Sequence, residues 1–477
     1  MNRYTIGRTG MKTKKLFGFE KAFFVSFIAT AIPVIIQVLM LSSRNLSDVL
    51  MVGTLGQTEV AAVGIVSKAM MISIVLLVGL SSGCGVLAAQ YWGANDLSGV
   101  KGVLGLSFGM AFALVVLPVL LFFTANPAVI MGLATSDSHL ANIASKFLGV
   151  ISLSVIFLAI VNVFGVGLRA IGQASTAMYF SIGGVALNVL LNYLLIFGKA
   201  GFPQLGIMGA AYATLISSVA EALLLTAMIY FTKHPLAFVP NDFIRYISKD
   251  RLVQFVRISV LATVNGFIWS TGIFLYHVIY GKIGTEALAV MSMMATVDSF
   301  SAAFEQGCAT ATAVLLGHTL GQQRFNAVID QAKGMLIISL LLSLALGSLL
   351  LLFYRPIIGL YGAIDDSLID TAFQVYMIMA LTFWLKTINA VGISGVLRSG
   401  GDLQAGLVID FTGQWLIGIP LALVGAFVLK WSLPQIFILV IMEDLVKACM
   451  TLYRIRQGKW VRNLVTVETR EQTYSAM

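Results

Sequence analysis

Residues 53–63 read GTLGQTEVAAV, and residues 281–291 read GKIGTEALAVM. The matching residues, each pair 228 positions apart, are Gly53 and Gly281, Gly56 and Gly284, and Ala61 and Ala289. The same offset relates GLSSGCGVLAAQYWG at 79–93 to GCATATAVLLGHTLG at 307–321. LRAIGQ at 168–173 then matches LRSGGD at 397–402 with an offset of 229. A near-constant offset over such a distance indicates a duplicated unit whose copies start on the same side, with a substrate site expected between them.

The composition predicts a membrane protein. Of 477 residues, 58% are hydrophobic and only 11% are charged, and the mean hydropathy is +0.94, whereas a soluble protein keeps roughly a quarter of its residues charged. Long apolar runs, for example 22–41 and 335–354, recur along the chain. A spanning helix needs about 20 apolar residues, and barrel strands are only about 10 residues long. We therefore expect an all-α, polytopic membrane protein of about twelve transmembrane helices in two six-helix lobes.

The expected spans follow the apolar runs. They are 20–48, 58–85, 99–124, 139–162, 174–197 and 206–231, then 253–280, 287–316, 328–354, 371–396, 406–429 and 433–453. The corresponding domains are an N-terminal lobe at 1–231, a cytoplasmic linker at 232–252, a C-terminal lobe at 253–455 and a cytoplasmic tail at 456–477.

The placement of the basic residues predicts the orientation. The net charge is +9, and Lys and Arg gather before the first span, around 233–257 and after the last span. The loop 126–139 has neither. By the positive-inside rule, both termini and the central linker are cytoplasmic. Because the basic residues flank membrane spans, we do not interpret them as a nucleic-acid-binding surface.

Asp48 is the first candidate functional residue, because burying an ionisable side chain inside a bilayer is costly and such residues usually have a function. It lies in SSRNLSDVLMVG, which could be a polar loop. However, 42–48 align by the repeat offset with 270–276, inside an apolar run, so we expect Asp48 at membrane depth. Arg44 lies one turn earlier and could bond along the same helix face, so the two could also simply neutralise each other.

Two amides form the second candidate, in ALNVLLNYLLIFG. Asn188 and Asn192 are four apart and so share one helix face. Their carbonyl oxygens suit a hard cation, although such amides also bond neighbouring helices in membranes. The spacing alone leaves both interpretations open.

The second half contributes Asp298 and Glu305, seven apart on one face of MATVDSFSAAFEQG, as a candidate second site. Glu305 could instead pair with a buried base such as Lys386. Asp410 and Glu443 are interpreted as packing or capping residues near helix ends. There is no GxxxxGK[ST] motif, so no nucleotide site is predicted, and any pumping must draw on an ion gradient or another chain.

Taken in order, several motifs over nearly the whole chain resemble those of the multidrug and toxic compound extrusion (MATE) transporters. They are PVIIQ at 33–37, SDVLMVGTLG at 47–56, AAQYWGAND at 88–96, GLRAIGQ at 167–173, LGIMGAAYAT at 205–214, VLLGHTLG at 314–321 and VLRSGGD at 396–402. The resemblance implies two six-helix lobes forming a V around a central cleft.

Carried over by motif, the resemblance implies an ion-coupling site formed by Asp48, Asn188, Asn192 and Thr214, with Na⁺ as a candidate ligand and no other metal. It also implies a helix-bending role for Pro33, since proline removes an internal amide hydrogen bond. The chain departs from some relatives in its seventh span, where ATVNGFIW at 262–269 has no acid, and in its tenth, where FWLKTINAVG at 383–392 has none. Coupling through the C-terminal lobe would then use another group, such as Glu305.

The resemblance therefore implies a secondary active antiporter, not an enzyme, that exports small cationic amphiphilic compounds in exchange for Na⁺ or H⁺ without a cofactor. The expected partners are a small-molecule substrate and membrane lipids, with no nucleic acid or nucleotide. We expect a monomer in the bacterial inner membrane. The rival functions are a flippase for a lipid-linked precursor, which would favour extra spans and a strongly cationic cleft, and an intramembrane enzyme. The four scattered histidines do not form an enzyme site.

Overall fold

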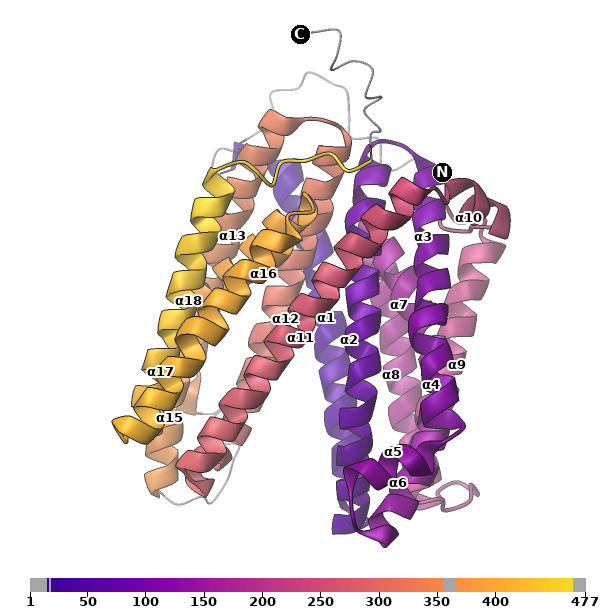
Figure 1. Cartoon of the computed structure of the whole chain (residues 1–477), viewed down its shortest axis with the longest axis vertical. Helices are drawn as coiled ribbons and strands as arrows, with labels where there is room; N and C mark the ends of the chain where they lie inside the picture. Colours follow the sequence, from indigo (N-terminus) through magenta and orange to yellow (C-terminus); the bar gives the residue numbers. More distant parts are fainter. Residues whose placement is uncertain (1–14, 17–18, 356–365, 466–477) are drawn as a thin grey trace, which may run out of the picture.

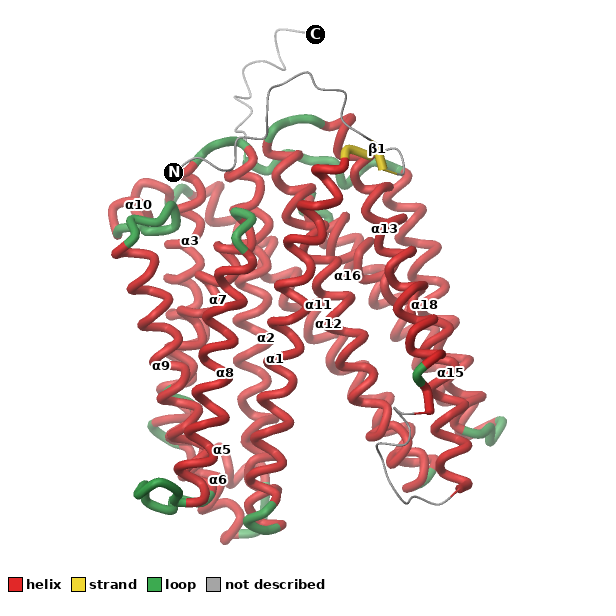
Figure 2. Tube along the Cα trace, turned by 180° about the vertical axis from the view of Figure 1, so that it is seen from behind, coloured by secondary structure: helices red, strands yellow, loops and turns green. Residues whose placement is uncertain are grey.

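The structure, a computed structural model, describes residues 15–16, 19–355 and 366–465. The basic residues before residue 15 and after residue 465 lie outside this part of the chain. Apart from a two-stranded hairpin of β1 (Lys15–Leu16) and β2 (Phe19–Glu20), the regular elements in the described ranges are helices. Figure 2 shows these helices running between two ends at which the loops gather.

The elements divide into the two halves expected from the repeat. The helices of the first half are α1 (Lys21–Gly53), α2 (Gln57–Gly93), α3 (Leu97–Ala111), α4 (Leu117–Val119), α5 (Pro127–Ala134), α6 (Ser138–Ile151), α7 (Ser154–Ala170), α8 (Ala174–Phe197) and α9 (Ile207–Phe231). A short α10 (Pro240–Tyr246) follows, and then α11 (Lys249–Ile283), α12 (Thr285–Gly321), α13 (Phe325–Leu352), α15 (Asp366–Ala390), α16 (Leu403–Phe411), α17 (Ile419–Leu423) and α18 (Leu433–Arg456). Wider π-helical turns continue several spans: η1 (Phe112–Val116), η2 (Leu120–Thr124), η3 (Val391–Leu397), η4 (Thr412–Gly418) and η5 (Val424–Val428).

The spans agree with the expected fold class. In the described ranges, 10 helices are long and apolar enough to cross a membrane, and the bent pair of α6 and α7 raises this to 11. The remaining long helix, α18, carries Glu443, Asp444 and Lys447 close together, so its composition alone does not mark it as a span. The prediction of an all-α membrane protein with twelve helices in two lobes is confirmed.

The fourth expected span, 139–162, differs from the structure. The chain there forms α6 and α7, bent by 44° at residues 152–153. The Ser152 hydroxyl donates to the Gly149 carbonyl at 3.2 Å, and the Ser154 hydroxyl donates to the Ile151 carbonyl at 2.6 Å. Side-chain hydrogen bonds of this kind compete with the backbone hydrogen bonds and bend helices. After the bend, α7 continues beyond the expected end at residue 162 to Ala170.

Helix boundaries have local causes. The Asp96 carboxylate accepts from the Gly99 amide at 2.9 Å and caps the first turn of α3. Asp137 caps α6 in the same way, through the amides of His139 and Leu140. At the C-terminal end of α8, Gly198 takes a left-handed φ of 65° and ends the helix. This conformation costs glycine little.

The two lobes form a V. Figure 1 shows two groups of helices that meet at the end carrying α10 and diverge toward the end carrying α5. α11 runs diagonally from the first end to the far end of the second group. α1 packs against α12, and in the matching manner α11 packs against α2. Equivalent helices of the two copies therefore make equivalent contacts.

Reciprocal glycines define the seam between the lobes. A Cβ atom added at Gly93 of α2 would overlap the backbone of His318 on α12, and one added at Gly321 of α12 would overlap the backbone of Gln90 on α2. The repeat offset relates Gly93 to Gly321 and Gln90 to His318. This is the pattern of an isologous interface, in which one surface packs against its own copy.

A second reciprocal pair lies farther along the same helices. An added Cβ at Gly79 would overlap Thr263 of α11, and one at Gly307 would overlap Ile35 of α1. The repeat offset again relates the two glycines, and it relates Ile35 to Thr263. Small residues allow this close approach of membrane helices, so the duplicated glycines produce a seam with approximate two-fold symmetry.

The segment after α18 ties the lobes together at their meeting end. Gln90, which is fully buried on α2, donates to the Ser399 carbonyl at 2.8 Å and accepts from the Leu464 amide at 2.7 Å. Gln254 of α11 donates to the Leu464 carbonyl at 2.9 Å, and the Asn463 side chain donates to the Leu320 carbonyl at 2.9 Å. Three helices, α2, α11 and α12, thus share hydrogen bonds with this short segment.

The seam predicts that Gly93→Ala destabilises the protein, because the added methyl group must separate α2 from the α12 backbone. Overpacking of this kind costs about 1–3 kcal/mol. Thermal unfolding of the purified protein measures the effect. Gly64→Ala is the matched control on the same helix, since an added Cβ there meets nothing within 4 Å. Equal unfolding temperatures for the two variants would contradict the importance of the seam.

Candidate functional site

Asp48 lies within α1, which runs unbroken from Lys21 to Gly53, and not in a loop. Asn192 on α8 donates a hydrogen bond from Nδ2 to Asp48 Oδ1, and the same Nδ2 lies 3.4 Å from Asn188 Oδ1. Asn188 Nδ2 donates to Thr214 Oγ1 on α9 at 3.3 Å. Both asparagines are completely buried. The structure therefore brings together the four residues proposed from sequence, from three helices.

This cluster has the chemistry of a site for a small hard cation or a proton. Asp48 supplies a carboxylate, and Asn188, Asn192 and Thr214 supply amide and hydroxyl oxygens, which are ligands of hard cations. The Asn192 Oδ1 atom is buried and has no hydrogen-bond partner among the residues that the structure describes, a condition that costs free energy unless a ligand satisfies it. Among the described residues, no group of three or more His, Cys, Asp or Glu side chains could hold a metal ion.

A second polar chain crosses the same lobe. Arg169 of α7 donates from Nη1 to Gln37 Oε1 on α1 at 3.1 Å, and Gln37 Nε2 donates to Ser181 Oγ on α8 at 2.8 Å. The Ser181 hydroxyl then donates to Glu221 Oε1 on α9 at 3.2 Å. Glu221 is an ionisable residue within an apolar run. Its partners come from three other helices, so no sequence spacing could reveal them.

Arg44 lies on α1 between these two polar groups, with only 9% of its surface exposed. The expected i, i+4 bond does not form: among the described residues, Arg44 has no direct ion pair with Asp48. Its guanidinium is instead within electrostatic reach of both Asp48 and Glu221. Pro33 lies earlier in α1, and the helix continues through it.

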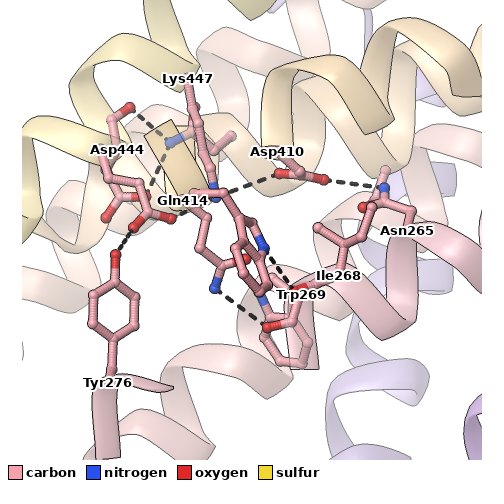
Figure 3. Close-up of polar contacts among 12 residues, drawn as sticks. Asn265, Ile268, Trp269, Tyr276, Asp410, Gln414, Asp444 and Lys447 are labelled. Atoms are coloured by element: carbon pink, nitrogen blue, oxygen red, sulfur yellow. Dashed lines mark hydrogen bonds and ion pairs between the residues drawn. The ribbon is translucent and has the colours of Figure 1, made fainter. Parts of the chain in front are cut away.

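The C-terminal lobe contains a cluster of buried charges (Figure 3). Lys447 Nζ lies 2.6 Å from Glu443 Oε1 and 3.5 Å from Asp410 Oδ1. The Tyr276 hydroxyl of α11 donates to Glu443, and Asn265 Nδ2 of the same helix donates to Asp410 Oδ2 at 3.0 Å. One lysine thus joins two carboxylates, each held by a side chain of α11.

The interpretation of Asp410 and Glu443 as residues near helix ends is wrong. Glu443 lies in the middle of α18, and α16 continues beyond Asp410 through η4. An isolated charge in an apolar run resembles a boundary when its partner on another helix is unknown. η4 leaves room for the cluster, because a Cβ added at Gly413 would overlap Lys447 and one added at Gly418 would overlap Glu443.

Asp298 and Glu305 lie on α12, at the edge of the same lobe. Lys386 Nζ is 3.5 Å from Asp298 Oδ1, while Glu305 makes no direct ion pair within the described ranges and only shares the electrostatic field of Lys386. The suggested Glu305–Lys386 pair is therefore not formed. Asp444, which the sequence analysis missed along with Lys447, accepts from Asn389 Nδ2 at 3.2 Å. The sequence feature that could have identified Asp444 and Lys447 is the group of charged residues at 443–447 within an apolar segment.

The acidic residues outnumber the basic ones in the network of charges around Lys386 and Lys447. Ion pairs and electrostatic contacts connect Asp298, Glu305, Asp410, Glu443 and Asp444 with Lys386, Arg398 and Lys447. Buried charges are costly unless they are compensated. The excess of carboxylates therefore favours the uptake of protons or cations.

These features, two lobes of six spans that together form a V and contain buried polar groups, define a polytopic membrane transporter. A family model described as MatE matches the chain twice, at residues 33–194 and 262–424, once in each lobe. The chain belongs to the MatE family of multidrug efflux transporters.

Comparison with individual proteins agrees with this assignment. An uncharacterised transporter, YisQ of Bacillus subtilis, is 26% identical and the match covers 90% of this chain and 93% of YisQ. A probable multidrug resistance protein of the same organism, YoeA, is 27% identical over 82% of this chain and 85% of its own length. The solved outward-facing structure of a multidrug resistance MATE family transporter superposes with a TM-score of 0.82 at 20% identity, over 91% of this chain and 96% of that one.

The ion-paired cluster predicts that Lys447→Met destabilises the protein strongly, because Asp410 and Glu443 lose the cation between them. Breaking a buried pair in this way costs about 3–5 kcal/mol. Thermal unfolding measures the loss, and Lys430→Met, at an exposed position, serves as the control. Adding Glu443→Gln to Lys447→Met should recover part of the stability. A double variant no more stable than Lys447→Met alone would contradict this account.

Proposed function

We propose that the protein is a secondary active antiporter that exports small cationic amphiphilic compounds in exchange for Na⁺ or H⁺. The observation that carries the proposal is the hydrogen-bonded cluster of Asp48, Asn188, Asn192 and Thr214 inside the N-terminal lobe. A carboxylate in a low-dielectric site strongly favours neutralisation, by a proton or by a bound cation. Ion occupancy at Asp48 can therefore change the relative stability of two lobe conformations.

Two further observations support the class of substrate. A largely apolar pocket of about 320 Å³ lies between α1 and the helices α12 and α13 of the other lobe, lined by Ile35, Leu39, Phe300, Ser301, Phe304, Leu346 and Leu350. Asp298 lies on the same helix as three of these residues, and its side chain is 56% exposed. An apolar wall near an accessible carboxylate suits a cationic amphiphile. We propose Glu305 and Asp298 as the second, C-terminal ion or substrate site.

The proposed orientation follows from charge. We place the end where the lobes meet in the cytoplasm, together with the 232–252 linker and both termini, and the diverging end outside the inner membrane. The basic residues around 233–257 support this orientation by the positive-inside rule. Residues 1–231 and 253–455 would then be the two moving lobes.

The orientation predicts the labelling of single cysteines introduced into a variant without Cys84, Cys308 and Cys449. In intact cells, a membrane-impermeant maleimide should not label Lys233→Cys or Lys459→Cys. It should label Asp137→Cys, in the loop without basic residues at the opposite end. If Lys233→Cys is labelled from outside in cells shown to be sealed, the proposed topology is wrong.

The ion site predicts that Asp48→Asn abolishes gradient-driven export, with at least a tenfold loss of rate, because the amide cannot exchange a proton or hold a cation by charge. Export of a fluorescent organic cation from proteoliposomes, with Na⁺ and H⁺ gradients imposed in separate experiments, measures this. Asp330→Asn, at an exposed carboxylate on α13, is the control. Export by Asp48→Asn at the normal rate under either gradient would show that Asp48 is structural.

A further inference from the structure

Arg44 creates a charge problem for the proposed ion site. Its guanidinium stays protonated in proteins, it is almost completely buried, and it follows Gln37 and precedes Asp48 on α1. A positive charge so close to a carboxylate opposes the binding of a second cation there. An ion site at Asp48 therefore needs another negative charge that can balance Arg44 when Asp48 is neutralised.

Glu221 is placed to provide that charge. It lies on α9, is 8% exposed, and is within electrostatic reach of Arg44. Ser181 donates to its carboxylate at 3.2 Å, and a Cβ added at Gly184 of α8 would overlap it, so the helix leaves space for this side chain. The position of Glu221 is thus built by the surrounding helices and is not a chance orientation of a long side chain.

The charges of the four helices around the site balance. Beyond Lys21 at the start of α1, the only ionisable Asp, Glu, Lys and Arg residues of α1, α7, α8 and α9 are Arg44, Asp48, Arg169 and Glu221. Two acids face two bases. When an ion neutralises Asp48, Glu221 is the one carboxylate left in this group to offset the positive charge of the buried guanidinium groups.

We propose that Glu221 is a positioning residue of the N-terminal ion site: it balances Arg44 while Asp48 holds the coupling ion. The inference rests on the proposed function of Asp48. Without Glu221, Arg44 acts on Asp48 alone and competes with the ion. Without Arg44, Asp48 attracts the ion more strongly. Removal of both charges returns the site to its original balance.

The test measures the half-saturating concentration of the coupling ion for export from proteoliposomes, in separate Na⁺ and H⁺ experiments. Glu221→Gln should raise this concentration about tenfold, and Arg44→Gln should lower it by a similar factor, as expected for one uncompensated charge at partly screened distance. The Arg44→Gln/Glu221→Gln double variant should lie within about threefold of the original protein. Asp330→Asn is the matched control, because it removes an exposed carboxylate on α13, outside the site, so its half-saturating concentration should not change.

Each outcome separates the alternatives. If Glu221 only supports the fold, the double variant will be as impaired as Glu221→Gln, and the proposal is wrong. It is equally wrong if Arg44→Gln weakens ion binding, a result that does not depend on whether Glu221→Gln folds. Loss of export in Asp48→Asn together with a normal Glu221→Gln would refute only this inference. Normal export by Asp48→Asn would instead refute the proposed ion site itself.

Discussion

The close approach of α2 and α12 at Gly93 and Gly321 is the contact on which the rest of the architecture depends. Each glycine lies against the backbone of the partner helix, and the two contacts are related by the same offset that relates the two halves of the sequence. No side chain larger than hydrogen fits there without moving a helix. The lobes are therefore joined along a narrow, approximately two-fold seam, and the helices can diverge away from it (Figure 1). A duplicated surface that packs against itself gives this geometry directly.

The symmetry of the seam does not extend to the charges. Inside the N-terminal lobe, Asp48 and Glu221 balance Arg44 and Arg169, whereas carboxylates are in excess in the charge network around Lys447 in the C-terminal lobe (Figure 3). Packing at the seam constrains both copies to the same small residues, since either copy must fit the other. Buried polar groups need only a partner within their own lobe, so each lobe can acquire a different set. The two lobes thus share one fold but contain different sets of buried polar residues.

Much of the fold was predictable because its causes are local. A run of about 20 apolar residues forms a membrane helix, because the backbone polar groups must be hydrogen-bonded within the segment in lipid. The repeat offset shows directly that the two lobes correspond. The spacing of Asn188 and Asn192 placed both amides on one face. Glu443 was misinterpreted because a lone carboxylate in an apolar run resembles a helix end until Lys447 and Tyr276 are seen beside it. The bend at Ser152 and Ser154 was missed because its hydroxyl bonds interrupt neither the hydropathy nor the repeat.

The sequence by itself determined the number of spans and their duplication, and it placed Asp48, Asn188 and Asn192 within spans, because these features follow from hydropathy, the repeat and helical periodicity. Only the tertiary structure decided which of those residues meet. Arg44 could have bonded Asp48 on its own helix, yet it is within electrostatic reach of both that carboxylate and Glu221, which is more than 150 residues away in the chain. Such pairings depend on the rotation and axial register of neighbouring helices. Packing around glycines such as Gly184 sets these parameters, and no spacing within a single helix records them.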